Sequence, residues 1–532
     1  MTITSFTFLG FVLATLIVYR SFPVKKQWWV LLAASIIFYL SFSIGGIFVM
    51  IGTSLLTYFS GIMVQKQKDK HYAWLKENKK NADKETRKAK KAFYQKRQKL
   101  IVAGTVAVTI GILFICKYYG VLATRFNGLF NTSLWTAENI LLPLGISYYS
   151  LQLIGYLVDV NRDIIPAERN PLKVILYGGF FLSIMQGPFN RYNDLMPQIC
   201  AEKRQKLTYV NFKFAVLKIT GGYIKKLCIA DQVGIIANEV FTNYNNYSGL
   251  GILLGIVCFA IQLYADFSGY MDIVIGIGQL FGINMPENFR QPFFSRNMSE
   301  FWKRWHITLG FWLQDYVFFP LLKSSLFKRI GKSITGKLGK EAGRRIPTYI
   351  GLFILWTLIG AWHGAGFNYV FGVGILQFLY IFLGEICDPI FEKIKKLLHI
   401  NDKKLYWHIF QSIRCTVLMM FAWVFFNSIT FFDALCMIKK VFVLPQLRQV
   451  TEVFSSDVVD GAIRTLLYII LCIIIILLID LLHEKGKSLR VLVCSRRYPV
   501  RLAFYLLLAF TIVIFGAYGD RFISSNFIYI GF

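Results

Sequence analysis

The chain has 532 residues, of which 55% are hydrophobic and only 17% are charged, and its mean hydropathy is +0.51. Soluble domains carry about 25% charged residues and disordered chains need low hydrophobicity, so this composition excludes both classes. A formal net charge of +30 would indicate nucleic-acid binding in a soluble protein. Here apolar runs divide the basic residues into blocks, which favours membrane topology and contact with anionic membrane lipid over nucleic acid.

Apolar runs long enough to cross a bilayer recur along the chain. Because a spanning helix needs about 20 mostly apolar residues, these runs predict about 11–13 membrane segments, some of them re-entrant. The runs lie near residues 3–20, 28–64, 100–123, 138–158, 172–190, 208–236, 248–283, 347–384, 408–427, 463–483 and 500–518. Those at 28–64 and 347–384 are long enough for two passes each, whereas 208–236 carries several lysines and suits a re-entrant or interfacial segment. We therefore expect an all-α polytopic membrane protein with one membrane domain over 1–532 and C-terminal membrane helices over 400–532.

Two basic blocks between apolar runs set the expected orientation. Residues 66–99 hold 14 Lys or Arg and 4 Asp or Glu, and residues 323–345 are similarly basic. Both blocks are short enough for the positive-inside rule, so both are expected on the cytoplasmic side. The pattern of 66–99 predicts a solvated loop or an interfacial helix on the anionic inner leaflet.

Metal, disulfide and serine-nucleophile sites find no support in the sequence. The nine cysteines form no CxxC pair and most lie in apolar runs, which is typical of small buried hydrophobic residues. No HExxH motif and no closely spaced third ligand accompanies the histidines, so we expect no metal. No G-x-S-x-G elbow surrounds a serine.

Ionisable side chains inside apolar sequence are concentrated in residues 262–320. Such groups are costly in a membrane, so each one is a candidate for function. Tryptophans and phenylalanines alternate with them, which suits a protein-lined, partly hydrated cavity better than a lipid-facing surface. The candidates for orienting a catalytic group or lining this cavity are Asp266, Ser268, Trp302, Trp305, Asp315 and, from the later segment around His363, Trp362.

Two histidines are the candidate catalytic residues. His363 lies deep in an apolar run among small residues, and His306 is flanked by aromatic and basic residues in the sequence WKRWHIT. A neutral imidazole has an ordinary pKa near 6.5 and can accept a proton from a hydroxyl group. For both residues the alternative is a buried histidine that is hydrogen-bonded between helices and has no chemical role.

Several longer motifs resemble one family of membrane enzymes. They are FWKRWHITLGFWLQDYVFFPL (301–321), GAWHGAGFNYVFGVG (360–374), LLPLGISYYSLQLIGYLVDVNR (141–162), QGPFNRYNDLMPQI (186–199), QLYADFSGYMDIVIGIGQLFGI (262–283) and FIYIGF (527–532). Together they resemble the membrane-bound O-acyltransferases (MBOAT), in the bacterial branch of the alginate O-acetyltransferases. The resemblance places a catalytic core at about 140–380, while 66–99 and 390–500 carry little of it.

This resemblance implies a ring of membrane helices around a central tunnel in a bacterial cytoplasmic membrane. A thioester donor, expected to be acetyl-CoA, would enter from the cytoplasm, although one related group uses a carrier-protein thioester. The acceptor would be an extracellular polysaccharide, often reached through a separate SGNH-type acetyltransferase and a glycan synthase complex. His363 matches the family's invariant histidine, the favoured general base or acyl relay, and His306 matches a second signature position on the donor side.

The chemistry of acyl transfer gives the other candidates their roles. Transfer from a thioester needs an activated hydroxyl and a stabilised oxyanion. Asp315 is a candidate to orient an imidazole, as acids do for other catalytic histidines. Lys303, Arg304 and Arg296 are candidates to bind phosphates of the donor, or else anchor the end of a span as positive-inside residues.

Two other classes of protein stay open. A transporter or flippase for a polysaccharide or lipid-linked sugar would also bury charges and contain many spans. It would show paired polar signatures in two halves, whereas here they are crowded into 262–372. A non-catalytic scaffold of an export complex also fits the sequence.

Overall fold

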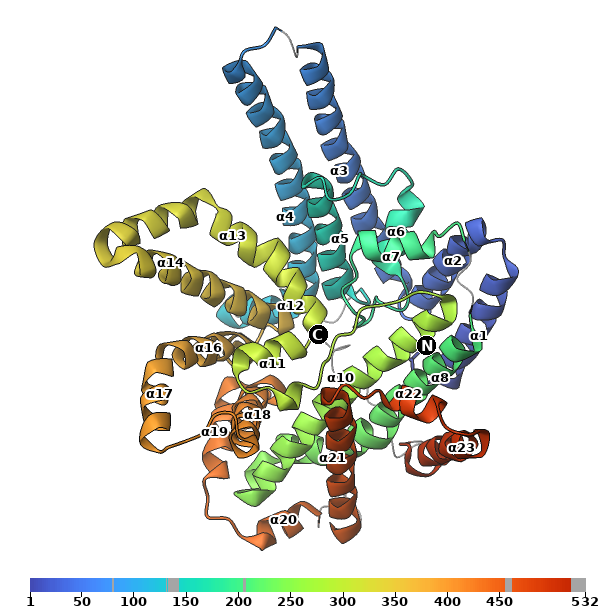
Figure 1. Ribbon diagram of the computed structural model, residues 1–532, viewed down its shortest axis with the longest axis vertical. Coiled ribbons are helices and arrows are strands. Elements are labelled where there is room, and N and C mark those ends of the chain that lie inside the picture. The colour runs from blue at the N-terminus through green and yellow to red at the C-terminus, as the bar shows by residue number, and fades with distance from the viewer. Residues whose placement is uncertain (79–80, 131, 133–142, 204–206, 455–461, 518–532) are drawn as a thin grey trace. The chain divides into compact units, whose positions relative to one another are not determined.

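The computed structural model describes residues 1–532 except 79–80, 131, 133–142, 204–206, 455–461 and 518–532. The structure is 81% helical, and the described residues contain no strand (Figure 1). Eight helices in the described part are long and apolar enough to cross a membrane, and α1 is a shorter apolar helix. These observations confirm the prediction of an all-α, multi-pass membrane protein. The arrangement of the helices as a ring around a tunnel stays a prediction.

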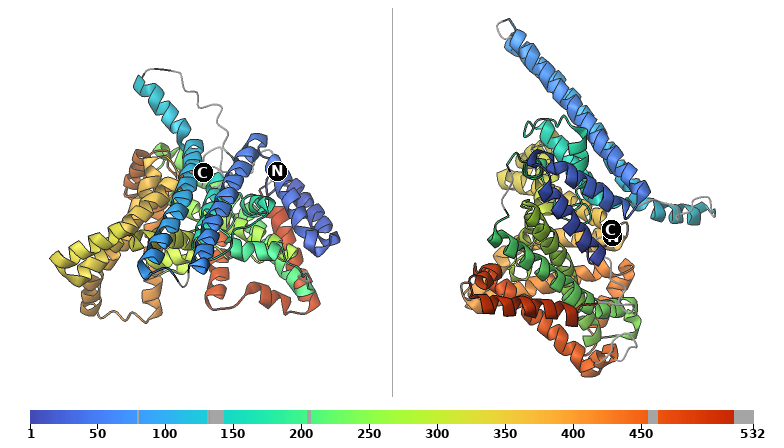
Figure 2. Two further views of the ribbon diagram at one scale, coloured as in Figure 1. Left: turned by 90° about the horizontal axis from the view of Figure 1, so that it is seen from above. Right: turned by 90° about the vertical axis from the view of Figure 1, so that its right-hand side faces the viewer.

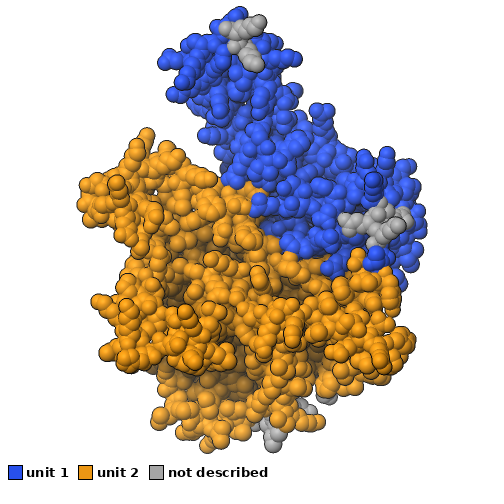
Figure 3. All heavy atoms as spheres, viewed as in Figure 1, with its two compact units in different colours: residues 1–208, 277–286 blue, residues 209–276, 287–532 orange. Residues whose placement is uncertain are grey.

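The described residues form two compact units, shown in different colours in Figure 3. Unit 1 contains Met1–Thr208 and Ile277–Pro286, and unit 2 contains Tyr209–Gly276 and Glu287–Phe532. The helices of unit 1 are α1 (Phe6–Ser21), α2 (Gln27–Leu40), α3 (Ile44–Glu77), α4 (Lys84–Phe130), α5 (Ile146–Asn161), α6 (Pro171–Gly179) and α7 (Tyr192–Ile199).

Unit 2 contains the remaining helices and three π-helical turns. They are α8 (Tyr209–Tyr223), η3 (Ile224–Ala230), α9 (Asp231–Thr242), α10 (Leu250–Phe281, whose last residues belong to unit 1), α11 (Met298–Arg304), α12 (Ile307–Leu313), η6 (Gln314–Phe318), α13 (Phe319–Lys323), α14 (Ser325–His363), α15 (Phe367–Tyr369), η7 (Val370–Ile375), α16 (Leu376–Ile386), α17 (Asp388–Leu397), α18 (Leu405–Asn427), α19 (Phe431–Val441), α20 (Leu447–Phe454), α21 (Ala462–Glu484), α22 (Leu489–Cys494) and α23 (Tyr498–Phe515).

The basic block at 66–99 forms a helical hairpin. The last part of α3 and the first part of α4 run antiparallel and side by side, as Figure 1 and the left view of Figure 2 show. At about 1.5 Å per residue, α3 is about 50 Å long, whereas a hydrocarbon core is about 30 Å thick. Both helices therefore continue from an apolar span into a charged, water-compatible extension, because a helix needs no break where its sequence turns polar.

One expected span is replaced by buried irregular backbone. Residues 172–190 predict a membrane segment, but α6 ends at Gly179 and the following residues form turns. Side chains satisfy part of this buried backbone, since the Tyr177 hydroxyl donates to Asn190 O at 2.7 Å. The Asn190 amide in turn donates to Ser183 Oγ at 2.8 Å. Non-helical backbone at membrane depth is tolerated where protein covers it in this way.

The second basic block also forms a hairpin, inside α14. Gly339 has φ 88°, a backbone conformation that favours glycine, and it divides α14 into two antiparallel limbs. The two limbs lie close together. A Cβ added at Gly343, in the second limb, would lie only 2.9 Å from the carbonyl oxygen of Gly331 in the first limb. The second limb carries the chain to His363, where α14 ends.

Candidate active site

A cavity of about 420 Å³ lies within unit 2, and both candidate histidines line it. Its walls come from α11, α12, α14, η7, α16 and α18. His306 and His363 are 57 positions apart in the sequence but are brought together at this one cavity. Their side chains are almost completely buried, with 3% and 4% of their surface exposed.

His363 is placed by the end of α14 and by small residues around it. The helix ends because Gly364 adopts an extended backbone conformation. The imidazole lies against the rings of Trp362 and Phe426, at centroid distances of 4.9 and 5.7 Å. A Cβ added at Gly360 would lie only 2.7 Å from the Cα of Val370, so this glycine allows α14 and η7 to approach closely.

His306 lies at the break between α11 and α12. Its φ of 48° and ψ of 49° fall in the left-handed region, which is uncommon for a residue with a side chain. Backbone bonds on both sides hold this conformation, from Arg290 N to Arg304 O at 2.9 Å and from Ile307 N to Asn288 O at 3.0 Å. Burial lowers the pKa of His306 to about 3, so its imidazole is neutral near pH 7.

Aromatic side chains form much of the cavity wall. The rings of Trp302 and Trp356 are 4.7 Å apart, and those of Trp305 and Trp423 are 5.2 Å apart. Trp302 Nε1 donates to Gln377 Oε1 at 3.2 Å, and Gln377 Nε2 donates to Gly372 O at the same distance. This chain of contacts fixes the Trp302 indole against the π-helical turn η7.

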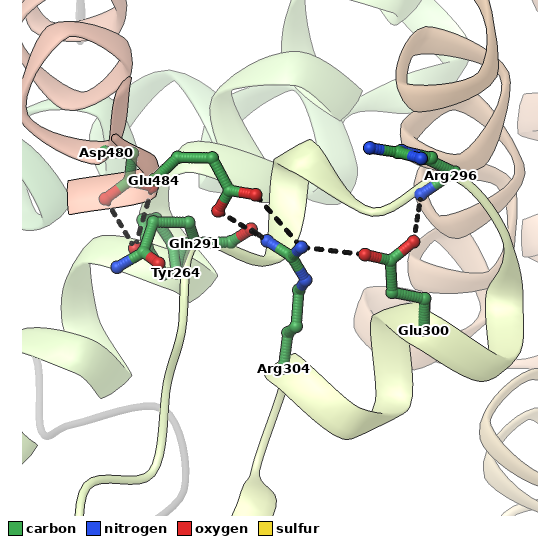
Figure 4. Close-up of polar contacts among 7 residues, drawn as sticks. All are labelled: Tyr264, Gln291, Arg296, Glu300, Arg304, Asp480 and Glu484. Carbon is green, nitrogen blue, oxygen red and sulfur yellow. Dashed lines mark hydrogen bonds and ion pairs between the residues drawn. The ribbon is translucent and has the colours of Figure 1, made fainter. Parts of the chain in front are cut away.

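Of the three basic residues proposed to bind the donor, only Lys303 lines the cavity. Arg304 instead binds two carboxylates, Glu300 and Glu484, each at 2.7 Å (Figure 4). The Arg296 side chain is exposed, and its backbone N donates to Glu300 at 2.9 Å. Arg304 therefore ties α11 to α21, and its positive charge is already balanced by protein groups.

Helix α21 also reaches α10 in this region. The Tyr264 hydroxyl donates to Asp480 at 3.0 Å, one turn before Glu484 on the same helix (Figure 4). Asp480 on α21 thus binds α10 through Tyr264. Glu484 on α21 binds Arg304, the last residue of α11, which lies two positions before His306. Sequence reasoning missed both acids, because they lie in a stretch that reads as a plain apolar span.

Four predicted cavity residues in unit 2 are not part of the cavity lining, and one of them, Trp362, only contacts the lining residue His363. Asp266 is 1% exposed and pairs with Lys226 at 2.7 Å, and Lys226 also pairs with Asp231 at 2.8 Å. Ser268 is buried on the same helix as Asp266. Asp315 lies in η6 beside the cavity-lining Gln314, but among the described residues neither it, Asp266 nor Ser268 belongs to the lining.

The structure adds neutral residues that sequence reasoning passed over. Gln377 and Trp423 line the cavity, and Asn288 holds the His306 segment through its backbone and side chain. The search for ionisable groups did not select amides. A buried amide inside an apolar run was a usable signal for Gln377, whereas Asn288 lies in a loop and offers none. The catalytic and donor-binding roles of all these residues stay predictions.

Comparison with known proteins agrees with the motifs. The model of the membrane-bound O-acyltransferase family matches residues 37–335, more than half of the chain, a range that includes His306 and ends before His363. The probable alginate O-acetylase AlgI of Pseudomonas syringae pv. tomato is 33% identical over 290 residues, covering 54% of this chain and 50% of the relative. The peptidoglycan O-acetyltransferase of Helicobacter pylori is 27% identical over 387 residues, with 68% and 65% covered.

The teichoic acid D-alanyltransferase of Bacillus subtilis is 31% identical over 268 residues, covering 49% of this chain and 62% of the relative. The chain spans about half the length of the alginate O-acetylases it matches. The family match covers more than half of the chain and includes α11, α12 and one of the two histidines of the cavity. The chain therefore belongs to the membrane-bound O-acyltransferase family.

Proposed function

We propose that the chain moves an acetyl group from a cytoplasmic thioester to hydroxyl groups of an extracellular polysaccharide, directly or through a partner acetyltransferase. The observation that carries this proposal is the presence of His306 and His363 on one cavity. Acyl transfer to a hydroxyl needs a group that accepts the hydroxyl proton, and a buried neutral imidazole is suited to this role. We place the protein in a bacterial cytoplasmic membrane, where a thioester pool lies on one side and the polymer on the other.

The names of the relatives support the reaction class. They describe an alginate O-acetylase, a peptidoglycan O-acetyltransferase and a teichoic acid D-alanyltransferase. Acetyl and D-alanyl are both acyl groups, and each name joins an acyl transfer to a polymer. We favour acetyl as the group and a polysaccharide as the acceptor, since the relatives with the higher identity are the alginate O-acetylases.

The proposed reaction balances as one substitution. The hydroxyl oxygen attacks the thioester carbonyl carbon while an imidazole, with His363 as the first candidate, takes the hydroxyl proton. The C–O bond forms, the C–S bond breaks, and the leaving thiolate takes the proton back from the imidazolium. Products are the O-acyl polymer and the free thiol of the donor. Proton transfer of this kind contributes roughly 10²–10⁴-fold to the rate.

The donor is proposed to be acetyl-CoA. Lys303 lines the cavity and is exposed, so its ammonium group is available to a phosphate of the donor. A carrier-protein thioester is the alternative donor. The two donors are distinguished by supplying each thioester in turn and measuring acyl transfer. A partner of the SGNH acetyltransferase type would receive the acyl group outside the membrane where transfer to the polymer is indirect.

The test measures acetylated surface polymer by mass analysis, in cells with the wild-type chain and with His363→Ala. We expect acetyl groups that depend on the chain and are lost in the variant, with equal protein in the membrane. His408→Ala is the matched control, because its Nε2 contacts the carbonyl of Asp402 away from the cavity. Unchanged acetylation in His363→Ala would contradict the proposed role of the cavity. Polymer export that fails while acetylation persists would favour a transporter.

A further inference from the structure

Three polar atoms lie within hydrogen-bond distance of the side-chain oxygen of Asn288. Thr308 N and Thr308 Oγ1 each lie 3.0 Å from Asn288 Oδ1, and His306 Nδ1 lies 3.3 Å from the same atom. Asn288 is 0% exposed, so water does not compete for these bonds. The amide belongs to the loop between α10 and α11, and it faces the segment in which α11 gives way to α12.

The contact with Thr308 fixes which end of the amide faces His306. A backbone N–H only donates, so the Asn288 atom that it meets must be the oxygen. The amide nitrogen points the other way and lies 3.6 Å from the sulfur of Met271. Because an amide oxygen only accepts, the ring nitrogen opposite it must carry a hydrogen. This assigns the hydrogen of neutral His306 to Nδ1 and the lone pair to Nε2.

Other contacts keep the imidazole in this orientation. The ring stands edge-on to Phe267, with centroids 4.9 Å apart and planes at 89°. The backbone oxygen of Asn288 accepts from Ile307 N, so one residue binds both the ring and the chain next to it. On the other side, Arg304 is anchored by Glu300 and Glu484, which limits movement of α11 (Figure 4).

We propose that Asn288 is a positioning residue that holds His306 as the Nδ1–H tautomer, with Nε2 as the nitrogen that accepts a proton. The assignment of the tautomer stands on the geometry alone, and its part in acyl transfer rests on the proposed function. Where His306 rather than His363 takes the hydroxyl proton in that reaction, the proton moves to Nε2, the ring becomes an imidazolium, and Asn288 continues to accept from Nδ1. An uncharged partner does this without attracting a proton to the ring before the hydroxyl arrives, as a carboxylate would.

The first experiment reads the tautomer directly. The protein is labelled with ¹⁵N-histidine, reconstituted in lipid nanodiscs without substrate, and studied by NMR. The ¹⁵N signals of His306 are identified as those that disappear in the His306→Gln variant. We expect a protonated Nδ1 and an unprotonated Nε2 in the wild type. A wild-type spectrum with the hydrogen on Nε2 would overturn the proposal, and this result needs no Asn288 variant to fold.

Substitutions then separate positioning from general structure. Asn288→Leu keeps the approximate size but removes the acceptor, and we expect a mixed or reversed tautomer. We also expect a fall in kcat on the order of 10²-fold with little change in KM. Asn288→Asp restores an acceptor at the same place, and we expect it to restore the Nδ1–H signal. A folded Asn288→Leu protein with the wild-type signal would overturn the proposal.

The matched control is another buried asparagine in unit 2. Asn368 is 2% exposed and donates to the carbonyls of Phe425 and Ser428 at 3.2 and 2.9 Å. Asn368→Leu is expected to lower thermal stability without moving the His306 signals, and a shift of the same kind would count against a specific role of Asn288. A wild-type protein with the expected tautomer but no acyl transfer would contradict the proposed function and leave the tautomer assignment standing.

Discussion

The position of His363 depends on one glycine three residues earlier in α14. A Cβ added at Gly360 would lie 2.7 Å from the Cα of Val370 and 2.8 Å from the carbonyl oxygen of Tyr369. Both neighbours are backbone atoms, so no side chain can rotate away. Ordinary contact begins at about 3.4 Å, and α14 and η7 must therefore move apart by about 0.7 Å.

A displacement of this size is large for a reacting group. Misplacement by about 1 Å can lower a rate about 10²-fold, so Gly360→Ala should lower acyl transfer by about one to two orders of magnitude. The assay measures thiol release from acetyl-CoA by purified protein in nanodiscs with acceptor polymer present. Gly384→Ala in α16 is the matched control, because a Cβ there meets no atom within 4 Å. The control should keep full activity.

The result that would refute this reasoning is a Gly360→Ala protein with wild-type activity and wild-type thermal stability. It would mean that the close packing of α14 on η7 does not set the position of His363. Loss of activity in Gly384→Ala to the same extent would also refute it, because that substitution adds a methyl group to open space.

Three other perturbations follow from the buried charges and from the cavity. Lys226→Met leaves two buried carboxylates, Asp266 and Asp231, without their shared cation, and should lower the free energy of unfolding by about 3–5 kcal/mol, measured by thermal unfolding in detergent. The pKa of His306 is about 3 when folded and near 6.5 when unfolded, so protons favour the unfolded state between these values. Stability should therefore fall as pH drops from 6.5, and less so in His306→Gln. Lys303→Gln should raise KM for acetyl-CoA and leave kcat largely unchanged.

Each of these expectations has a clear contrary result. An unchanged melting temperature in Lys226→Met would show that the buried ion pairs are not needed for folding. Identical pH profiles of stability in wild type and His306→Gln would contradict a depressed pKa at this histidine. A lower kcat in Lys303→Gln with unchanged KM would contradict a role in binding the donor.

The spans with continuous apolar sequence were predicted closely. The runs at 248–283, 408–427 and 463–483 correspond to α10, α18 and α21 within about three residues. The run at 172–190 was not a span, because α6 ends at Gly179 and the following turns are stabilised by buried side chains. Composition alone cannot distinguish a lipid-exposed helix from apolar backbone covered by protein.

The site was predicted in part. Both histidines could be selected from sequence, since each is a costly polar group in an apolar or aromatic setting. Their shared cavity could not, because it depends on how α11, α14 and η7 pack. Asp266 was expected near the cavity, but its partner Lys226 lies 40 positions earlier in the chain, and sequence does not show such a pairing.

The central claim is that an acyl group passes across the membrane through the cavity shared by His306 and His363. It is tested most directly in proteoliposomes that contain ¹⁴C-acetyl-CoA inside and acceptor polymer, with any partner acetyltransferase, outside. For molecules inserted with their cytoplasmic face inward, we predict labelled polymer outside while CoA stays in the lumen, and loss of this signal in the double variant His306→Ala, His363→Ala. Label on the polymer at the wild-type rate in the double variant would contradict the account.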